Sequence, residues 1–476
     1  MKNRNKTRTN TIETNDNISF PVGTILAVKK YSRKIELDQI FSPFKKRGIP
    51  LTGLVNALIV YKLSENLSLT KGSDWINRSE VLDMFGLKAF EQRTLFRAVE
   101  LMGANYQQII LDLQDSLFEQ YNFDNTDVNM DWSSLILWGD KAKIGQYGYS
   151  RDHRPDKKQI TFGITELRKP INIPIGLTIA SGNTNDQTHF QTTFEQVKDR
   201  LQPNSRIIFD KGANGKGNLN AIIASKMQFL TAKQLNKSDD TLIKSFCCKK
   251  AQLIDESDGV YGMKITFPSR YNYFYFSEKL KKEQIASAER KTERMYEQAR
   301  DIEEAVKKGR IPKRYTVSNV LVDAKVEYQT KLQDLSKREA LDLANKASLT
   351  GREGFFCLTS SDDLTLEQAL ALYCEKDSVE KIMQSLKNEI NIKPLRVWSD
   401  NSIYGALLIG YLAHLIISLI RYDEPELKTT STKFIKISLS NLTVTVENPG
   451  IGEKRTIYSN FDQINKLICL QNTAKT

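Results

Sequence analysis

Cysteine and histidine are scarce in this sequence, which contains five cysteines and three histidines among 476 residues. The cysteines form no Cys-x-x-Cys pair and show no metal-ligand spacing with the histidines, which argues against a zinc site. We therefore expect free thiols in a reducing compartment. The five positions are Cys247, Cys248, Cys357, Cys374 and Cys469.

Long hydrophobic runs are also lacking, apart from residues 405–420, which His414 and Ser418 interrupt. A membrane span needs about 20 predominantly apolar residues. We therefore expect a buried core helix here and no membrane partner. The glycine-containing turn at residues 211–217 (KGANGKG) has neither GK[ST] nor GxGxxG, so it carries no nucleotide-binding fingerprint.

Positive charge is what the sequence has in excess. Lys and Arg outnumber Asp and Glu by 69 to 57, giving a net charge of +12. Such an excess favours a polyanionic partner. Residues 1–50 hold a large share of it, and the first seventeen residues have almost no apolar side chains. We expect residues 1–20 to form a flexible basic arm, without the apolar core of a signal peptide.

Residues 21–121 repeat apolar side chains at three- and four-residue intervals, which predicts a helical domain. Two of its helices are expected to meet at Gly86, and the second carries Arg93 and Arg97. A DNA-binding helix-turn-helix and two plainly packed helices both fit this pattern. We assign the region as a DNA-binding or dimerisation domain.

Residues 122–235 change to short β-rich segments separated by turn residues. Three strands, an amphipathic helix, then strand, helix and strand follow in order. This order predicts an α/β fold of the ribonuclease H-like kind, a mixed sheet with flanking helices. The plan is interrupted at residues 236–350, where a highly charged helix is expected from Ser277 to about Lys308, and resumes at 351–425. A tail of strands and a short helix is expected at 426–476.

A single acid stands out in the segment YCEKDSVEKIMQSLK, residues 373–387. In one continuous helix, Tyr373, Lys376, Glu380 and Lys387 would share an arc of roughly 60° beside an apolar stripe. Alone, this pattern is also typical of an ion-paired surface helix.

Two further acids belong to predicted strands. Asp131 lies in VNMDWSSL, and Asp210 ends SRIIFD before the glycine-containing turn. A carboxylate at the end of a buried strand costs desolvation free energy unless a cation or a donor faces it. Asp127 lies four residues before Asp131 on the same face of an ideal strand, so it is the alternative for the first acid.

The order of these motifs resembles the DDE insertion-sequence transposases. Asp131 in DWSS is followed by YGYSRDHRPDKKQI, SGNTND, IIFDKGANG and then Tyr-x2-Lys-x3-Glu-x6-Lys. The group that carries a Tyr-Arg-Glu-Lys signature is the most similar, over about residues 122–421. That group has an insertion domain between the second Asp and the Glu, which matches residues 236–350. Lys376 departs from the signature, because it replaces an Arg and cannot bind phosphate in the bidentate way.

The resemblance implies a DNA transposase whose metal ligands and catalytic residues are Asp131, Asp210 and Glu380. The residues after Asp131 favour it over Asp127, since Trp-Ser-Ser lies where the family has small hydroxyl residues. Carboxylates suit hard cations, so Mg²⁺ (or Mn²⁺) is expected, with two ions per active site. Asp131 would bridge the ions. The expected phosphate contacts are Tyr373, Lys376, Lys387, Arg151, Arg154 and Lys157.

The expected partners are double-stranded DNA, as terminal inverted repeats and as target, and a second copy of the chain in a homodimeric DNA complex. The expected location is cytoplasmic and nucleoid-associated. Two alternatives stay open: a ribonuclease H-like nuclease without strand transfer, and a catalytically altered or domesticated DNA-binding protein. A coiled-coil scaffold would rest only on residues 277–345 and leave the carboxylates unexplained.

Overall fold

The computed structural model describes residues 18–469 except 67, 152–153, 310–335, 393–394, 396 and 448–454. The chain divides into two compact units, one of residues 1–228 and 375–476 and one of residues 229–374. The predicted arm lies outside the described residues except for 18–20, which begin a strand.

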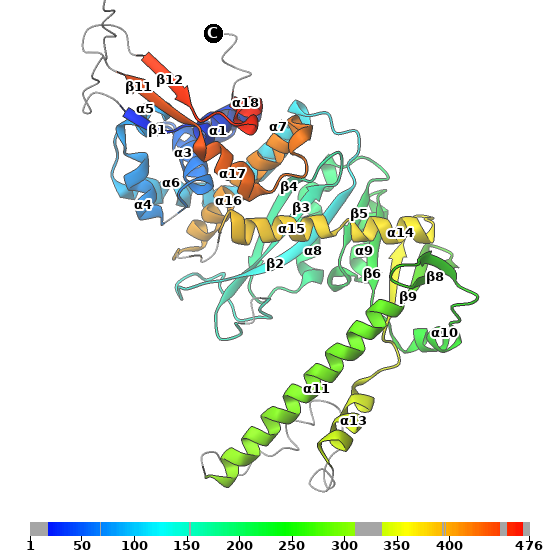
Figure 1. The fold of residues 1–476 in the computed structure, drawn as a ribbon. Coiled ribbons are helices and arrows are strands. Elements are labelled where there is room, and N and C mark those ends of the chain that lie inside the picture. The colour runs from blue at the N-terminus through cyan, green and yellow to red at the C-terminus, as the bar shows by residue number, and fades with distance from the viewer. Residues whose placement is uncertain are drawn as a thin grey trace, which may run out of the picture. The chain divides into compact units, whose positions relative to one another are not determined.

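The sheet of the first unit has the strand order β4-β3-β2-β5. Neighbours β2–β3 and β3–β4 are antiparallel, whereas β2 and β5 are parallel. Three antiparallel strands followed by a parallel fourth confirm the predicted α/β, ribonuclease H-like fold (Figure 1). The strands are β2 (Val128–Ile136), β3 (Gln159–Leu167), β4 (Ile173–Ser181) and β5 (Arg206–Phe209).

Helices cover both faces of this sheet. Alternate residues of a strand point to opposite faces. Trp132 of β2 donates a hydrogen bond to Thr193 of α8 (3.0 Å), whereas Asn129 of β2 donates to Ser378 of α15 (3.0 Å). Asp131 therefore belongs to the α15 face. The helices here are α8 (Asp186–Val197), α9 (Lys216–Ala224), α15 (Asp377–Gln384) and α16 (Asp400–Asp423).

The N-terminal part of the first unit is helical, as its apolar spacing predicts. The predicted break at Gly86 is present, because Gly86 adopts a left-handed conformation (φ 60°) that ends a helix. The elements are β1 (Ile18–Pro21), α1 (Gly23–Lys34), α2 (Leu37–Phe41), α3 (Leu51–Leu63), α4 (Leu69–Ile76), α5 (Ser79–Phe85), α6 (Gln92–Ala104) and α7 (Tyr106–Gln120).

Helix α16 contains the apolar run of residues 405–420. Among the described residues it alone has the length and apolar composition of a membrane span, yet 89% of its apolar window is buried within the protein. It packs on α3, α6 and β4, as expected of a core helix.

Two glycines allow α6 and α16 to cross closely. A Cβ atom on Gly405 would lie 2.0 Å from the carbonyl oxygen of Val99, and one on Gly103 would lie 1.7 Å from that of Asn401.

We expect Gly405→Ala to lower the free energy of unfolding by at least about 3 kcal/mol, since the backbone of one helix must move. Urea denaturation measures this. Gly217→Ala in α9, where a Cβ meets nothing within 4 Å, should change it by less than about 1 kcal/mol. Equal effects would contradict the close crossing.

The tail differs from its prediction. Strands and a short helix are predicted for residues 426–476, but residues 432–441 form a further helix, α17 (Thr432–Asn441). Its buried residues recur at helical spacing, and the Ser431 hydroxyl caps its first turn. Strands β11 (Thr443–Glu447) and β12 (Arg455–Ser459) join β1 in a small sheet, and α18 (Gln463–Cys469) ends the described chain.

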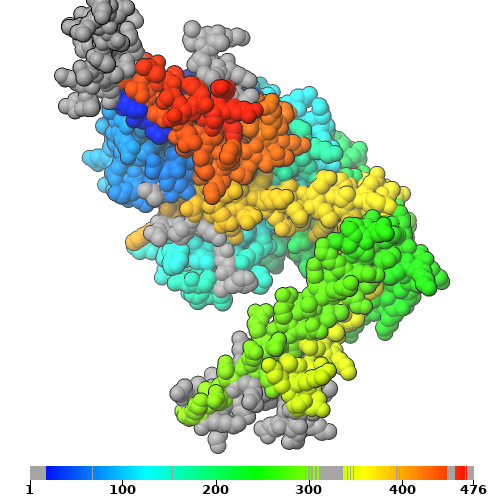
Figure 2. Space-filling model, in the orientation of Figure 1, coloured from blue at the N-terminus to red at the C-terminus, as the bar shows by residue number. Residues whose placement is uncertain are grey.

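The second unit has the strand order β6-β10-β9-β8-β7, and the boundary between the units falls within β6. The predicted charged helix is α11, and α13 lies alongside it (Figures 1 and 2), with Lys337 paired to Glu293 at 3.7 Å. The elements are β6 (Gln228–Lys233), α10 (Asp240–Ser245), β7 (Gln252–Asp255), β8 (Val260–Phe267), β9 (Arg270–Ser277), α11 (Glu278–Lys307), α13 (Lys337–Ser348), β10 (Phe355–Ser360) and α14 (Leu366–Cys374).

Candidate active site

Asp131 and Asp210 lie at the same level of two neighbouring parallel strands. The register of β2 and β5 ends at Met130 opposite Phe209. Continued by one residue, it sets Asp131 beside Asp210, on strands about 4.8 Å apart. Strand β5 stops at Phe209, and Asp210 accepts a hydrogen bond from the backbone N–H of Lys211 (2.8 Å). The parallel pairing thus brings together two acids that are far apart in the sequence.

Glu380 approaches the sheet on α15. The predicted continuous helix over residues 373–387 is wrong: α14 ends at Cys374, α15 begins at Asp377, and residues 385–389 form a π-helical turn. Lys376 therefore caps α15 instead of standing within a helix. Its side chain is only 5% exposed, and its Nζ donates to Glu380 Oε1 at 2.9 Å.

The Lys376 ammonium lies in the field of all three acids. Burial lowers the pKa of Lys376, but the charges of Asp131, Glu380 and Asp210 outweigh burial and hold the pKa above its ordinary value. Burial raises the pKa of Asp131 to about 6, against the opposing effects of Lys376 and Arg151. The charge of this one buried ammonium therefore interacts with three carboxylates from three separate elements.

A fourth acid, Asp186, belongs to the same neighbourhood. It pairs with Arg151 at 3.0 Å, and burial raises its pKa, with a further contribution from the charge of Asp210. Gly212 lies close to this acid, since a Cβ there would be 2.6 Å from Asp186 Oδ2. Sequence reasoning missed Asp186 as a site residue, although it ends the SGNTND motif.

Asp127, the alternative first acid, lies apart from this group. It precedes β2, four residues or about 13 Å along the strand from Asp131. Its carboxylate accepts a hydrogen bond from the Arg206 backbone (2.7 Å) and pairs with the Arg206 guanidinium (3.4 Å). The geometry therefore groups Asp131, and not Asp127, with Asp210.

Only some of the predicted phosphate contacts lie near the acid cluster. Arg151 does, because it pairs with Asp186 and its charge acts on Asp131. Arg154 instead forms an exposed pair with Asp156 (2.8 Å), and the Nζ of Lys157 lies 5.5 Å from the ring centroid of Trp138. Lys387 is half-buried in the π-helical turn. Tyr373 ends α14, which belongs to the second unit.

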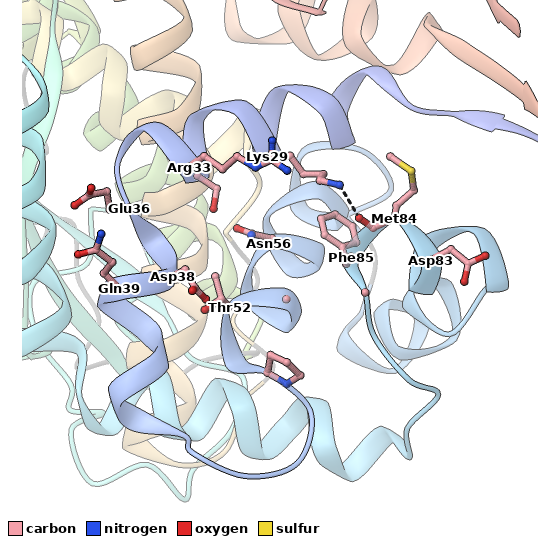
Figure 3. A pocket seen from close by; sticks show the side chains of 14 residues that line it. Lys29, Arg33, Glu36, Asp38, Gln39, Thr52, Asn56, Asp83, Met84 and Phe85 are labelled. Carbon is pink, nitrogen blue, oxygen red and sulfur yellow. Dashed lines mark hydrogen bonds between the residues drawn. The ribbon is translucent and has the colours of Figure 1, made fainter. Parts of the chain in front are cut away.

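A separate cleft of about 700 Å³ opens in the helical domain among α1, α2, α3 and α5 (Figure 3). Lys29 and Arg33 line it together with acids that include Asp38 and Asp83, and Lys29 donates to the Met84 carbonyl (2.9 Å). None of the predicted site residues lines this cleft, so it is distinct from the acid cluster.

Lys376→Met tests the electrostatics of the cluster. In the absence of divalent cations at pH 8, we expect it to lower the free energy of unfolding by about 1–3 kcal/mol, since three acids lose their buried cation while Glu380 stays partly solvated. The loss should shrink as the pH falls through about 6 and Asp131 becomes neutral. Denaturant titrations at several pH values measure this. Lys381→Met, on the exposed side of α15, is the control, and an equal, pH-independent loss in both would contradict the assignment.

Comparison with known proteins identifies the family of the chain. Residues 133–416, more than half of the chain, match the family described as the transposase DDE domain; the match includes Asp210 and Glu380 and begins two residues after Asp131. No curated protein matches the sequence. Among solved structures, a piggyBac transposase synaptic complex with hairpin DNA is similar at 13% identity and a TM-score of 0.43, over 90% of this chain and 81% of that chain. The family match decides the identity: the chain belongs to the transposase DDE domain family.

Proposed function

We propose that this DDE transposase cuts DNA at the ends of an insertion sequence and joins those ends to target DNA, using Asp131, Asp210 and Glu380 to bind two Mg²⁺ or Mn²⁺ ions. One observation carries the proposal: Lys376 donates a hydrogen bond to Glu380 of α15, and the charges of Asp131 of β2 and Asp210 at the end of β5 also act on its buried ammonium. A structural ion pair needs one acid, whereas a site built for several positive charges needs an excess of acids.

The donor set fits a hard divalent cation, because such ions prefer carboxylate oxygens and members of this family generally use them. When bound, the ions would activate the attacking oxygen and stabilise the leaving oxygen of the phosphodiester. Within the described residues, no three acidic, histidine or cysteine side chains already stand at ligating separation. Ion binding would therefore require Glu380 to exchange its hydrogen bond with Lys376 for the ion.

We assign roles to the individual residues on this basis. Asp131, Asp210 and Glu380 would hold the ions through their carboxylate oxygens, with Asp131 shared between the two ions. Lys376, once released by Glu380, would offer its ammonium to a DNA phosphate as a point charge. From the order of its motifs, we propose that the chain is a variant of the Tyr-Arg-Glu-Lys signature group, with Lys376 in place of the Arg. Tyr373, Lys387, Arg151, Arg154 and Lys157 remain proposed phosphate contacts.

The proposed substrate is double-stranded DNA, bound as terminal inverted repeats and as target. The net charge of +12 supports a polyanionic partner. Joining two ends at one target needs two active sites, so we propose a homodimer in the DNA complex, acting in the cytoplasm on nucleoid DNA.

A strand-transfer assay tests this function. Short duplexes with the terminal-repeat sequence and a free 3′-hydroxyl are incubated with supercoiled plasmid and MgCl₂. The proposal predicts covalent joining of the 3′ ends to plasmid, abolished by EDTA and by 3′-dideoxy ends. Mg²⁺-dependent cutting without joining would instead favour a nuclease, and DNA binding without either reaction would favour a domesticated binding protein.

A further inference from the structure

A buried polar network joins β3 to the start of α15. Glu166, near the end of β3, is fully buried, and its Oε1 accepts hydrogen bonds from Asn129 (2.9 Å) and from the Ser378 hydroxyl. Its Oε2 is buried without a hydrogen-bond partner. Asn129 also donates to the Ser378 hydroxyl (3.0 Å). Ser378 lies on α15 two residues before Glu380, and Asn129 lies on β2 two residues before Asp131.

A second tie holds the same end of the helix. Arg168, two residues after Glu166, forms an ion pair with Glu375. The Arg168 side chain is only 3% exposed, whereas that of Glu375 is 59% exposed. Glu375 and Ser378 are three residues apart, and Lys376 lies between them. Glu166 and Arg168, at the end of β3, thus hold the start of α15 through two contacts that lie about one helical turn apart.

As a purely structural feature, this network would cost folding free energy. A buried carboxylate with an unpartnered oxygen costs roughly 1–3 kcal/mol or more, and apolar packing of the same volume serves stability as well or better. Placing a reacting group is different, because an error of about 1 Å can cost 10²-fold in rate. Helix α15 has only eight residues and is separated from α14 by a turn. The helix alone therefore does not determine the position of Glu380.

We propose that Glu166 and Arg168 are positioning residues that clamp the start of α15 on the sheet and so set Glu380 opposite Asp131 for divalent-cation binding. This rests on the proposed function of the three acids. Groups that orient metal ligands from outside the ligand set typically change affinity by 10–100-fold when they are removed.

The test uses Ser378, whose hydroxyl can be deleted with little change in volume. Calorimetric titration of the full-length protein with MnCl₂ should show Ser378→Ala weakening binding by about 10-fold or more. Ser378→Thr, which keeps the hydroxyl, should bind within about threefold of wild type. Ser385→Ala is the matched control. Ser385 lies just after α15, and it is also buried and hydrogen-bonded, to Glu389 (3.0 Å) and to Thr432 (3.2 Å). It should change stability but not Mn²⁺ affinity.

Glu375→Gln checks the second tie. It should weaken Mn²⁺ binding as well, and the double variant with Ser378→Ala should depart from the sum of the two effects, because both ties hold one helix. Wild-type affinity in Ser378→Ala, or equal losses in Ser378→Ala and Ser385→Ala, would overturn the clamp and leave the proposed function standing. A wild-type protein that binds no Mn²⁺ would overturn both.

Discussion

Asp210→Asn and Glu380→Gln are each expected to lower Mg²⁺-dependent DNA cleavage by at least about 10²–10³-fold. Each substitution keeps the shape of the side chain but removes a negative charge from the cluster around Lys376. Loss of a single preorganised electrostatic group costs this much in other active sites, and loss of an ion should cost more. The measurement is the initial rate of cutting at the terminal repeat in saturating MgCl₂.

The matched control is Asp377→Asn, an exposed acid in the first turn of the same helix. It should cut within about threefold of wild type. The double variant Asp210→Asn/Glu380→Gln should be little worse than either single variant, because groups that act as a unit lose activity together. A rate near that of wild type in either single variant would remove that residue from the site.

Asp131→Asn should abolish cleavage and yet stabilise the protein when divalent cations are absent. The folded-state pKa of Asp131 is about 6 against an ordinary 3.8, so the folded state binds this proton more tightly than the unfolded chain. The stability that comes from the protonated form is therefore lost as the pH rises from about 4 to 6. Above pH 7 the wild type carries the full penalty, up to about 3 kcal/mol for a shift of about two units, and the Asn variant avoids it.

The pH profile distinguishes this effect from general stabilisation. Denaturation in EDTA should show equal stability of Asp131→Asn and wild type near pH 4 and a growing advantage of the variant up to pH 7. Asp127→Asn, just before the same strand, should do the opposite at pH 7 and lower the free energy of unfolding by about 1–3 kcal/mol, because Asp127 is paired with Arg206. Destabilisation of Asp131→Asn at pH 8 would contradict the electrostatic description of the site.

Local pattern was enough to predict much of the sheet. The strands that carry Asp131 and Asp210 are short, β-rich and bounded by turn residues, and their order limits the topology to few choices. The register that sets the two acids side by side could not be predicted, because parallel pairing joins segments that the sequence keeps far apart. The buried nature of α16 was predictable from its length and its interrupting polar residues.

The helix that carries Glu380 shows where sequence periodicity fails. The side-chain pattern of residues 373–387 fits one continuous helix. In the structure the helix is interrupted at Glu375 and Lys376, where Glu375 pairs with Arg168 and Lys376 contacts the acid cluster. The burial of Lys376 beside the carboxylates was not predictable from its match to a signature, because it comes from tertiary contacts; its contact with a phosphate stays a prediction. Asp186 and Glu166 were missed because their importance comes from tertiary contacts with Arg151 and Ser378.

The most direct test is to locate the ions. Crystals of the full chain with a terminal-repeat duplex and MnCl₂ can be measured by anomalous diffraction at the manganese edge. The proposed site predicts density within about 2–2.5 Å of carboxylate oxygens of Asp131 and Asp210, a second peak on the Glu380 side, and a broken Lys376–Glu380 hydrogen bond. An intact Lys376–Glu380 pair with no manganese between Asp131 and Asp210 would contradict it.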